Sequence, residues 1–215
     1  MTGSSFDIVV LISGRGSNLQ SIIDAIANRE LPVRIAAVIS NRADATGLQH
    51  AKNAGVTVAV VDDKKFSTRE SFDAELMRVI DSYQPNLVVL AGFMRILGEP
   101  FVRHYSGKLV NIHPALLPEF PGLNTHARAL TSGATRHGAS VHFVTPEVDA
   151  GPVIIQRAVQ VLESDTAETL AARVLEQEHE IYPLAIRWIA ENRVSIDGDR
   201  VLIDGAELAE QGLIH

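Results

Sequence analysis

The chain has 215 residues, 46% of them hydrophobic and 21% charged, which is ordinary for a globular protein with one sizeable core. Its formal net charge of −7 argues against a nucleic-acid partner held by a broad basic face, although backbone amides can still bind a small anion. The sequence has no cysteine, which excludes disulfides, thiolate metal sites and a cysteine nucleophile. Residues 1–7 carry no signal for secretion and no apolar run reaches the length of a membrane span, so we expect a cytoplasmic protein without a membrane partner.

Apolar strands and amphipathic helices alternate through the first half of the chain. Strands are expected at 8–12, 35–39, 56–61 and 87–91, and helices at 19–28, 44–54 and 67–83. We expect Ser17 or Asn18 to cap the first of these helices. Units of strand, helix and strand cross over with a right hand and build a parallel sheet, whose carboxyl ends collect ligands.

The second half of the chain mixes these units with adjacent strands. The expected elements are strands at 109–113, 139–145 and 153–161, helices at 125–131 and 166–192, and a hairpin in the last residues. We therefore predict a Rossmann-like α/β fold with a mostly parallel sheet, helices on both faces and an antiparallel extension in the C-terminal half. Residues 1–190 would form a single domain, and residues 191–215 a C-terminal hairpin or tail.

A glycine-rich loop, residues 13–18, joins the first strand to the first helix. Its glycines allow the backbone to approach a ligand closely, and the helix N-terminus offers unpaired N–H groups to an anion. Ser17 and Asn18 add side-chain donors. The loop matches neither a Walker sequence nor a complete dinucleotide fingerprint, and a bare Gly-x-Gly turn is usually a tight connection. By itself it indicates at most one phosphate.

Three polar residues suggest carbonyl chemistry. Asn111 and His113 are two apart on a strand, so they point to the same face at its carboxyl end, and Asp149 follows later. The amide and a protonated imidazole are donors for an oxyanion, and Asp149, if adjacent, would orient the imidazole and favour its protonated form. Each residue alone is often just a turn residue. No serine or cysteine nucleophile is indicated, so the attacking group would belong to a substrate.

Two further features have weaker signals. The apolar loop, residues 93–97, follows a strand and contains one arginine, so it either lines a pocket for a flat heterocycle or packs a strand against a helix. His137 and His142 lack the spacing of a metal site. We expect core or surface roles for both histidines, and no metal.

Four motifs together resemble the phosphoribosylglycinamide formyltransferase family, folate-dependent enzymes of purine synthesis. The similarity runs from about Phe6 to Trp188, in order and with the family's spacing. Two positions depart from it, since Arg15 stands where the family often has Asn, and Ala115 replaces a frequent Ser. The motifs are Ser13-Gly-Arg-Gly-Ser-Asn-Leu-Gln20, Ala91-Gly-Phe-Met-Arg-Ile-Leu97, Asn111-Ile-His-Pro-Ala-Leu-Leu-Pro118 and His142-Phe-Val-Thr-Pro-Glu-Val-Asp-Ala-Gly-Pro152.

The resemblance implies transfer of a formyl group from 10-formyltetrahydrofolate, as co-substrate, to the amine of 5′-phosphoribosylglycinamide. The N-terminal half would bind the phosphate, and the C-terminal half the folate and the reacting groups. Only small-molecule substrates are implied as partners, besides a possible homodimer. The implied roles are catalysis for Asn111, His113 and Asp149; phosphate binding for Gly16, Ser17 and Asn18; the glycinamide side for Glu178; and folate binding for Arg69, Met94, Arg95, Ile96, Leu97 and Asn111.

Three alternatives stay open at this point. Methionyl-tRNA formyltransferase and formyltetrahydrofolate deformylase share the catalytic trio, but the first needs a further tRNA-binding domain with a basic surface and the second an N-terminal regulatory domain. We expect neither, because the chain is acidic and its first strand begins at about Phe6. A non-catalytic binder of a phosphorylated metabolite would bind the phosphate ligand but release no tetrahydrofolate.

Overall fold

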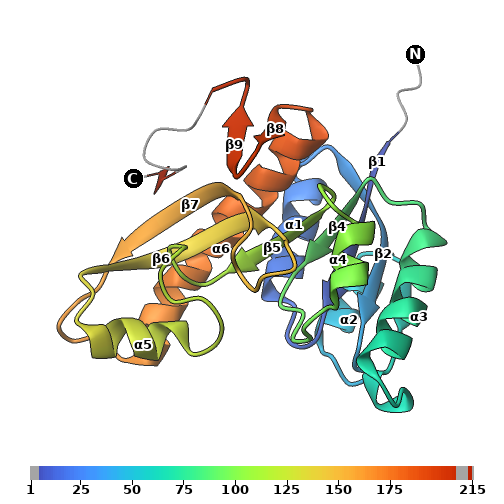
Figure 1. The fold of residues 1–215 in the computed structure, drawn as a ribbon, viewed down its shortest axis with the longest axis horizontal. Coiled ribbons are helices and arrows are strands. Elements are labelled where there is room, and N and C mark those ends of the chain that lie inside the picture. The colour runs from blue at the N-terminus through green and yellow to red at the C-terminus, as the bar shows by residue number, and fades with distance from the viewer. Residues whose placement is uncertain (1–4, 207–212, 215) are drawn as a thin grey trace. The chain divides into compact units, whose positions relative to one another are not determined.

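The computed structural model describes residues 5–206 and 213–214, the last two by their backbone alone. The chain divides into two compact units, Met1–Val110 and Asn111–His215. The coloured ribbon of Figure 1 follows the elements of both units along the chain. None of the described helices has the length and apolar character that a membrane crossing requires.

Unit 1 is built on strands in the order β4-β1-β2-β3, and the pairs β1–β2, β1–β4 and β2–β3 are parallel. The unbroken apolar sequence of β1 explains its central place, since Ile8 to Ile12 have no exposed surface. The elements are β1 (Phe6–Ile12), α1 (Ser17–Ala27), β2 (Val33–Ser40), α2 (Gly47–Asn53), β3 (Val58–Val60), η1 (Asp63–Lys65), α3 (Arg69–Asp81), β4 (Leu87–Leu90) and α4 (Glu99–His104).

The start of α1 corrects one prediction. Neither Ser17 nor Asn18 caps the helix, because the N-cap residue is Gly16, in the left-handed conformation with φ of 76°. A Cβ atom on Gly16 would lie 2.6 Å from the Cα of Gly47, so only glycine fits there. The Gly47 amide also donates to the Gly14 carbonyl over 2.9 Å, which holds the first residue of α2 against the loop.

Helix α4 was missed by the sequence patterns because it is only 6 residues long. It begins after Gly98 and has Pro100 in its first turn, where the missing N–H of proline has no partner to lose. The position of that proline was the available signal. Helix α4 packs against α3 in unit 1.

In unit 2 the strands follow the order β5-β6-β7-β10, where β6–β7 is antiparallel and β7–β10 is parallel. Strand β5 begins in unit 1 and its last three residues belong to unit 2. Helix α6 packs on β6 and β7, as Figure 1 shows. The elements are β5 (Leu109–His113), α5 (Thr125–Ser132), β6 (Arg136–Phe143), β7 (Val153–Gln160), α6 (Ala167–Ala190), β8 (Val194–Asp197), β9 (Arg200–Ile203) and β10 (Leu213–Ile214).

The long helix α6 has a defined start. Thr166 caps it, and the side chains of Thr166 and Thr169 bond reciprocally to each other's backbone amides as a capping box. Leu170, Val174 and Ile181 are fully buried on its inner face. The sequence had left Asp165 and Thr166 as alternative caps, and the structure selects Thr166.

The predicted α/β fold with a mostly parallel sheet and an antiparallel extension is confirmed. The predicted hairpin near the C-terminus is confirmed as well, since β8 and β9 pair as a separate antiparallel sheet. Part of the predicted tail, at 207–212 and 215, lies outside the described residues, whereas β10 joins the edge of β7. The single domain over residues 1–190 stays a prediction.

Candidate active site

Unit 2 gathers the predicted catalytic residues into one buried cluster. Asn111 and His113 come from the end of β5, and Asp149 comes from the connection between β6 and β7. The Nδ1 atom of His113 lies 3.4 Å from Oδ2 of Asp149, and the two side chains are only 6% and 11% exposed. The structure therefore brings all three residues together, with His113 buried and with Asn111 and Asp149 half-buried.

His142, from the end of β6, is the fourth member of the cluster and is 2% exposed. Burial is the main cause that lowers the pKa of His142, so its imidazole is neutral. Its Nδ1 donates to the Phe143 carbonyl over 2.9 Å, since a carbonyl can only accept. Its Nε2 is then an acceptor, and the amide Nδ2 of Asn111 donates to it over 3.2 Å. One amide hydrogen of Asn111 stays available for another acceptor.

The loop after β5 contacts the same cluster. The Nε2 atom of His113 donates to the Phe120 carbonyl over 3.0 Å, and the Gly122 amide donates to Oδ2 of Asp149 over 2.8 Å. Phe120 and Asp149 both have positive φ, 52° and 55°, a conformation that costs a residue with a side chain about 1 kcal/mol or more. Two of the strained residues of the chain therefore lie where the loop after β5 meets His113 and Asp149.

His142 was assigned only a core or surface role by the sequence. It is buried, but it also determines how the amide of Asn111 is oriented. The available signal was its spacing from Ser140, since two polar residues two apart on a strand share one face. The Ser140 hydroxyl bonds the backbone of Ala115 and Leu117 and so fixes the start of the loop after β5. Glu178, the residue predicted for the glycinamide side, lies on α6 and is 8% exposed.

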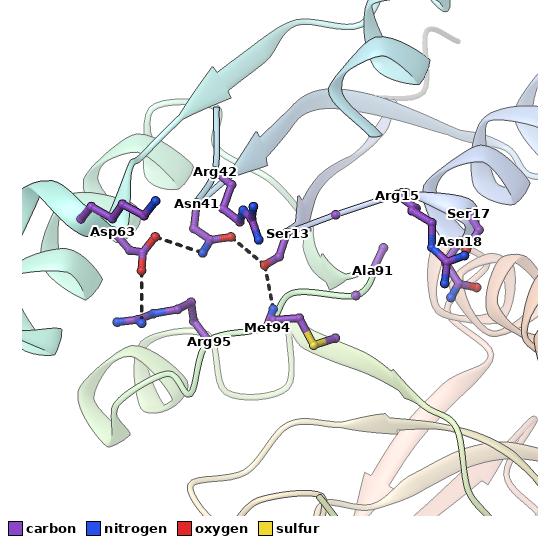
Figure 2. Close-up of a pocket in the computed structure, with 14 residues that line it drawn as sticks. Ser13, Arg15, Ser17, Asn18, Asn41, Arg42, Asp63, Ala91, Met94 and Arg95 are labelled. Atoms are coloured by element: carbon purple, nitrogen blue, oxygen red, sulfur yellow. Dashed lines mark hydrogen bonds and ion pairs between the residues drawn. The ribbon is translucent and has the colours of Figure 1, made fainter. Parts of the chain in front are cut away.

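Unit 1 contains an open pocket of about 630 Å³ at the carboxyl ends of its strands. The glycine-rich loop forms one wall, so Gly16, Ser17 and Asn18 all line it. Figure 2 labels Ser17 and Asn18 among the residues that line the pocket. Four cationic side chains and one carboxylate contribute to the lining, which favours an anion despite the acidity of the whole chain. These charged residues are Arg15, Arg42, Lys64, Arg95 and Asp63.

The apolar loop forms the opposite wall of this pocket through Met94 and Arg95. Met94 is 68% and Ile96 is 67% exposed, whereas Phe93 is buried and Leu97 is half-buried. Two large apolar side chains held in solvent on one loop are typical of a ligand surface. The guanidinium of Arg95 pairs with Asp63 over 3.2 Å.

The end of the apolar loop is held by Asp73 from α3. Its Oδ2 accepts the Gly98 amide over 2.7 Å, and burial is the main cause that raises the pKa of this carboxyl. A Cβ atom at Gly98 would lie 3.7 Å from Nε of Arg69, so the predicted folate residue Arg69 is close to the end of the loop. All five residues predicted for folate binding in unit 1 therefore belong to the apolar loop or its neighbourhood.

Comparisons with known proteins agree with the motifs. The family described as formyl transferase matches residues 6–186. The phosphoribosylglycinamide formyltransferase of Escherichia coli K12 is 52% identical over 96% of this chain and 97% of its own length. This chain therefore belongs to the formyl transferase family, a class of group-transfer enzymes.

Two solved structures extend the likeness to the fold. A phosphoribosylglycinamide formyltransferase from Coxiella burnetii superposes with a TM-score of 0.92 and 50% identity over 98% of this chain and 99% of that one. A glycinamide ribonucleotide transformylase from Symbiobacterium toebii has a TM-score of 0.91 and 48% identity over 94% and 95% of the two chains. The resemblance stated from the four motifs is thus confirmed.

Proposed function

We propose that this chain transfers the formyl group of 10-formyltetrahydrofolate to the amine of 5′-phosphoribosylglycinamide, giving formylglycinamide ribotide and tetrahydrofolate in purine synthesis. The observation that carries the proposal is the buried cluster of Asn111, His113, Asp149 and His142 in a member of the formyl transferase family. The names of its near full-length relatives support the choice of the glycinamide substrate.

The side chains of the cluster divide the chemistry between them. Bound 10-formyltetrahydrofolate would supply an electrophilic formyl carbon. The substrate amine adds to it with a new C–N bond, the formyl oxygen becomes negative, and the bond to the folate nitrogen breaks once that nitrogen has received a proton. Asn111 and protonated His113 donate hydrogen bonds to the oxygen that becomes negative. Asp149 stabilises the charged imidazole of His113, and the proton lost by the amine passes through a water to the folate nitrogen.

The Nε2 atom of His113, which this mechanism needs as a donor to the reacting oxygen, now donates to the Phe120 carbonyl. His113 can donate to the reacting oxygen only after this carbonyl is displaced, because one N–H cannot serve two acceptors equally well. The hydrogen bond from Gly122 to Asp149 belongs to the same loop. We therefore propose that the loop after β5 moves when substrates bind.

The pocket of unit 1 suits the two remaining tasks. Amide groups at the start of α1, with Ser17 and Asn18, would bind the substrate phosphate. The apolar loop would face the flat pterin of the folate through Met94, Arg95, Ile96 and Leu97. Arg69 would lie near the folate too. Glu178 would contact the glycinamide side of the substrate. The proposal includes no metal.

A direct assay tests the function. Purified protein is mixed with glycinamide ribotide and a 10-formyl folate, and the deformylated folate is followed by absorbance. We expect deformylated folate to form only when the ribotide is present. Release of formate without ribotide would indicate a deformylase, and formylation of charged methionyl-tRNA would indicate the tRNA enzyme. Binding of both ligands without release would leave a non-catalytic binder.

Two finer parts of the proposal concern the state of the protein in the cell. We propose that it works in the cytoplasm on small molecules alone. A homodimer is a further possibility that light scattering at assay concentration tests directly, with a mass of 23.3 kDa expected for one chain. A measured mass equal to that value would rule the dimer out.

A further inference from the structure

Ser13 joins the two loops that line the pocket of unit 1. It follows β1, is 5% exposed and is the first residue of the glycine-rich loop. Its hydroxyl accepts the amide of Met94 over 2.7 Å and donates to Oδ1 of Asn41 over 2.6 Å. Its own amide donates to the Gly92 carbonyl over 3.1 Å. Figure 2 shows Ser13 between the Asn41 side chain and the Met94 backbone.

The partners of Ser13 leave little freedom for a different arrangement. A serine hydroxyl has one proton, which Ser13 donates to Oδ1 of Asn41. The amide of Met94 therefore donates to a lone pair on the same hydroxyl oxygen. Asn41 in turn donates from Nδ2 to Oδ1 of Asp63 over 3.3 Å, and Oδ2 of Asp63 pairs with Arg95. The same network therefore holds Met94 and Arg95, two consecutive residues of the apolar loop.

We propose that Ser13 is a positioning residue that couples the two loops, so that a phosphate bound to the glycine-rich loop tightens folate binding on the apolar loop. This inference rests on the proposed function, because it takes these loops as the phosphate and folate sites. A phosphate that fixes the glycine-rich loop also fixes the Met94 amide through the Ser13 hydroxyl, so a folate that binds next bears less of the entropy cost of ordering the apolar loop. Linkage requires the effect to be reciprocal.

The size of the coupling follows from the bond that transmits it. One buried neutral hydrogen bond contributes an amount equivalent to about a 2- to 10-fold change in a binding constant. We therefore expect ribose 5-phosphate to tighten the binding of tetrahydrofolate by about 2- to 10-fold in the wild-type protein. Without the hydroxyl of Ser13 the tightening should vanish.

Calorimetric titrations test the proposal. The Kd of tetrahydrofolate is measured with and without saturating ribose 5-phosphate, and the ratio of the two values is the coupling. The ratio should fall to one in Ser13→Ala. Both values come from the same preparation, so a misfolded fraction affects them equally and cancels in the ratio.

Two further variants make the test specific. Ser40→Ala removes another fully buried hydroxyl, at the end of the neighbouring strand β2, which accepts from the Arg42 amide instead of Met94. It should keep the wild-type ratio. Asp63→Asn removes the ion pair with Arg95, so it should weaken tetrahydrofolate binding in the absence of ribose 5-phosphate and keep the ratio.

Three outcomes would overturn the coupling: a wild-type ratio of one, an unchanged ratio in Ser13→Ala, or an equal loss in Ser40→Ala. The formyl transfer assay separates these from a failure of the proposed function. If the wild-type protein transfers formyl groups but its two Kd values for tetrahydrofolate are equal, only the coupling proposal is wrong. If the wild-type protein binds neither tetrahydrofolate nor ribose 5-phosphate and transfers no formyl group, both proposals are wrong.

Discussion

The two units use opposite means to present polar groups. Within the described residues, unit 2 buries three imidazoles, those of His113, His137 and His142, whereas no histidine of unit 1 is buried. Unit 1 instead surrounds an open pocket with long cationic side chains, backbone amides and exposed apolar groups. Buried groups change the stability of a developing charge, while groups at an open pocket mainly hold a ligand. Substitutions in unit 2 should therefore lower kcat, and those in unit 1 should raise KM.

The largest effect is expected from the donors of unit 2. Removal of one oxyanion donor typically costs about 100- to 1000-fold in turnover, so Asn111→Ala and His113→Ala should each lower kcat by that order. Folate binding, measured by titration, should stay largely intact. Near-normal turnover in either variant would remove that residue from the catalytic roles and break the contrast between the units.

The buried imidazoles should also make unit 2 sensitive to acid. Burial, followed by the charge of His126, lowers the pKa of His137 from 6.5 to about 4. The folded state thus holds the neutral form, and its contribution to stability is complete above pH 6.5 and disappears as the pH falls towards 4. The loss is at most about 3 kcal/mol. Urea unfolding across this range should show a shallower pH dependence in His137→Phe, and an identical slope would contradict the assignment.

Substitutions in the glycine-rich loop should raise the KM for the substrate that carries the phosphate. Each hydrogen bond to a charged phosphate is worth about 1.5 kcal/mol or more, so the double variant Ser17→Ala with Asn18→Ala should raise the KM for glycinamide ribotide about tenfold or more. The KM for the folate should rise less. Steady-state kinetics with each substrate varied in turn measures both values. An equal rise in both would show that this loop is not the phosphate site.

The smallest effect sharpens the role of His142. Its neutral Nε2 orients the Asn111 amide, and one such bond contributes about 1 kcal/mol, so His142→Phe, which removes the acceptor, should lower kcat by about fivefold. The same substitution in an Asn111→Ala background should have almost no further effect. Additive losses in that double variant would mean that His142 acts independently of Asn111.

The sequence predicted the elements better than their ends. Unbroken apolar runs such as Ile8 to Ile12 identify central strands because their burial on both faces needs no further information. The cap of α1 could not be predicted in that way. Gly16 is required by the approach of Gly47, which belongs to the next helix. The short helix α4 was missed because six residues give too little periodicity.

The sequence by itself determined the α/β fold, the family and the residues whose chemistry fits formyl transfer, because apolar periodicity and motif spacing are local properties of the chain. Only the tertiary structure decided which atoms meet. Asn111 and His142 are 31 positions apart, and Ser13 and Met94 are 81 positions apart. Such partners, together with the burial that keeps His142 neutral, depend on how strands pair and loops return, so no local pattern encodes them.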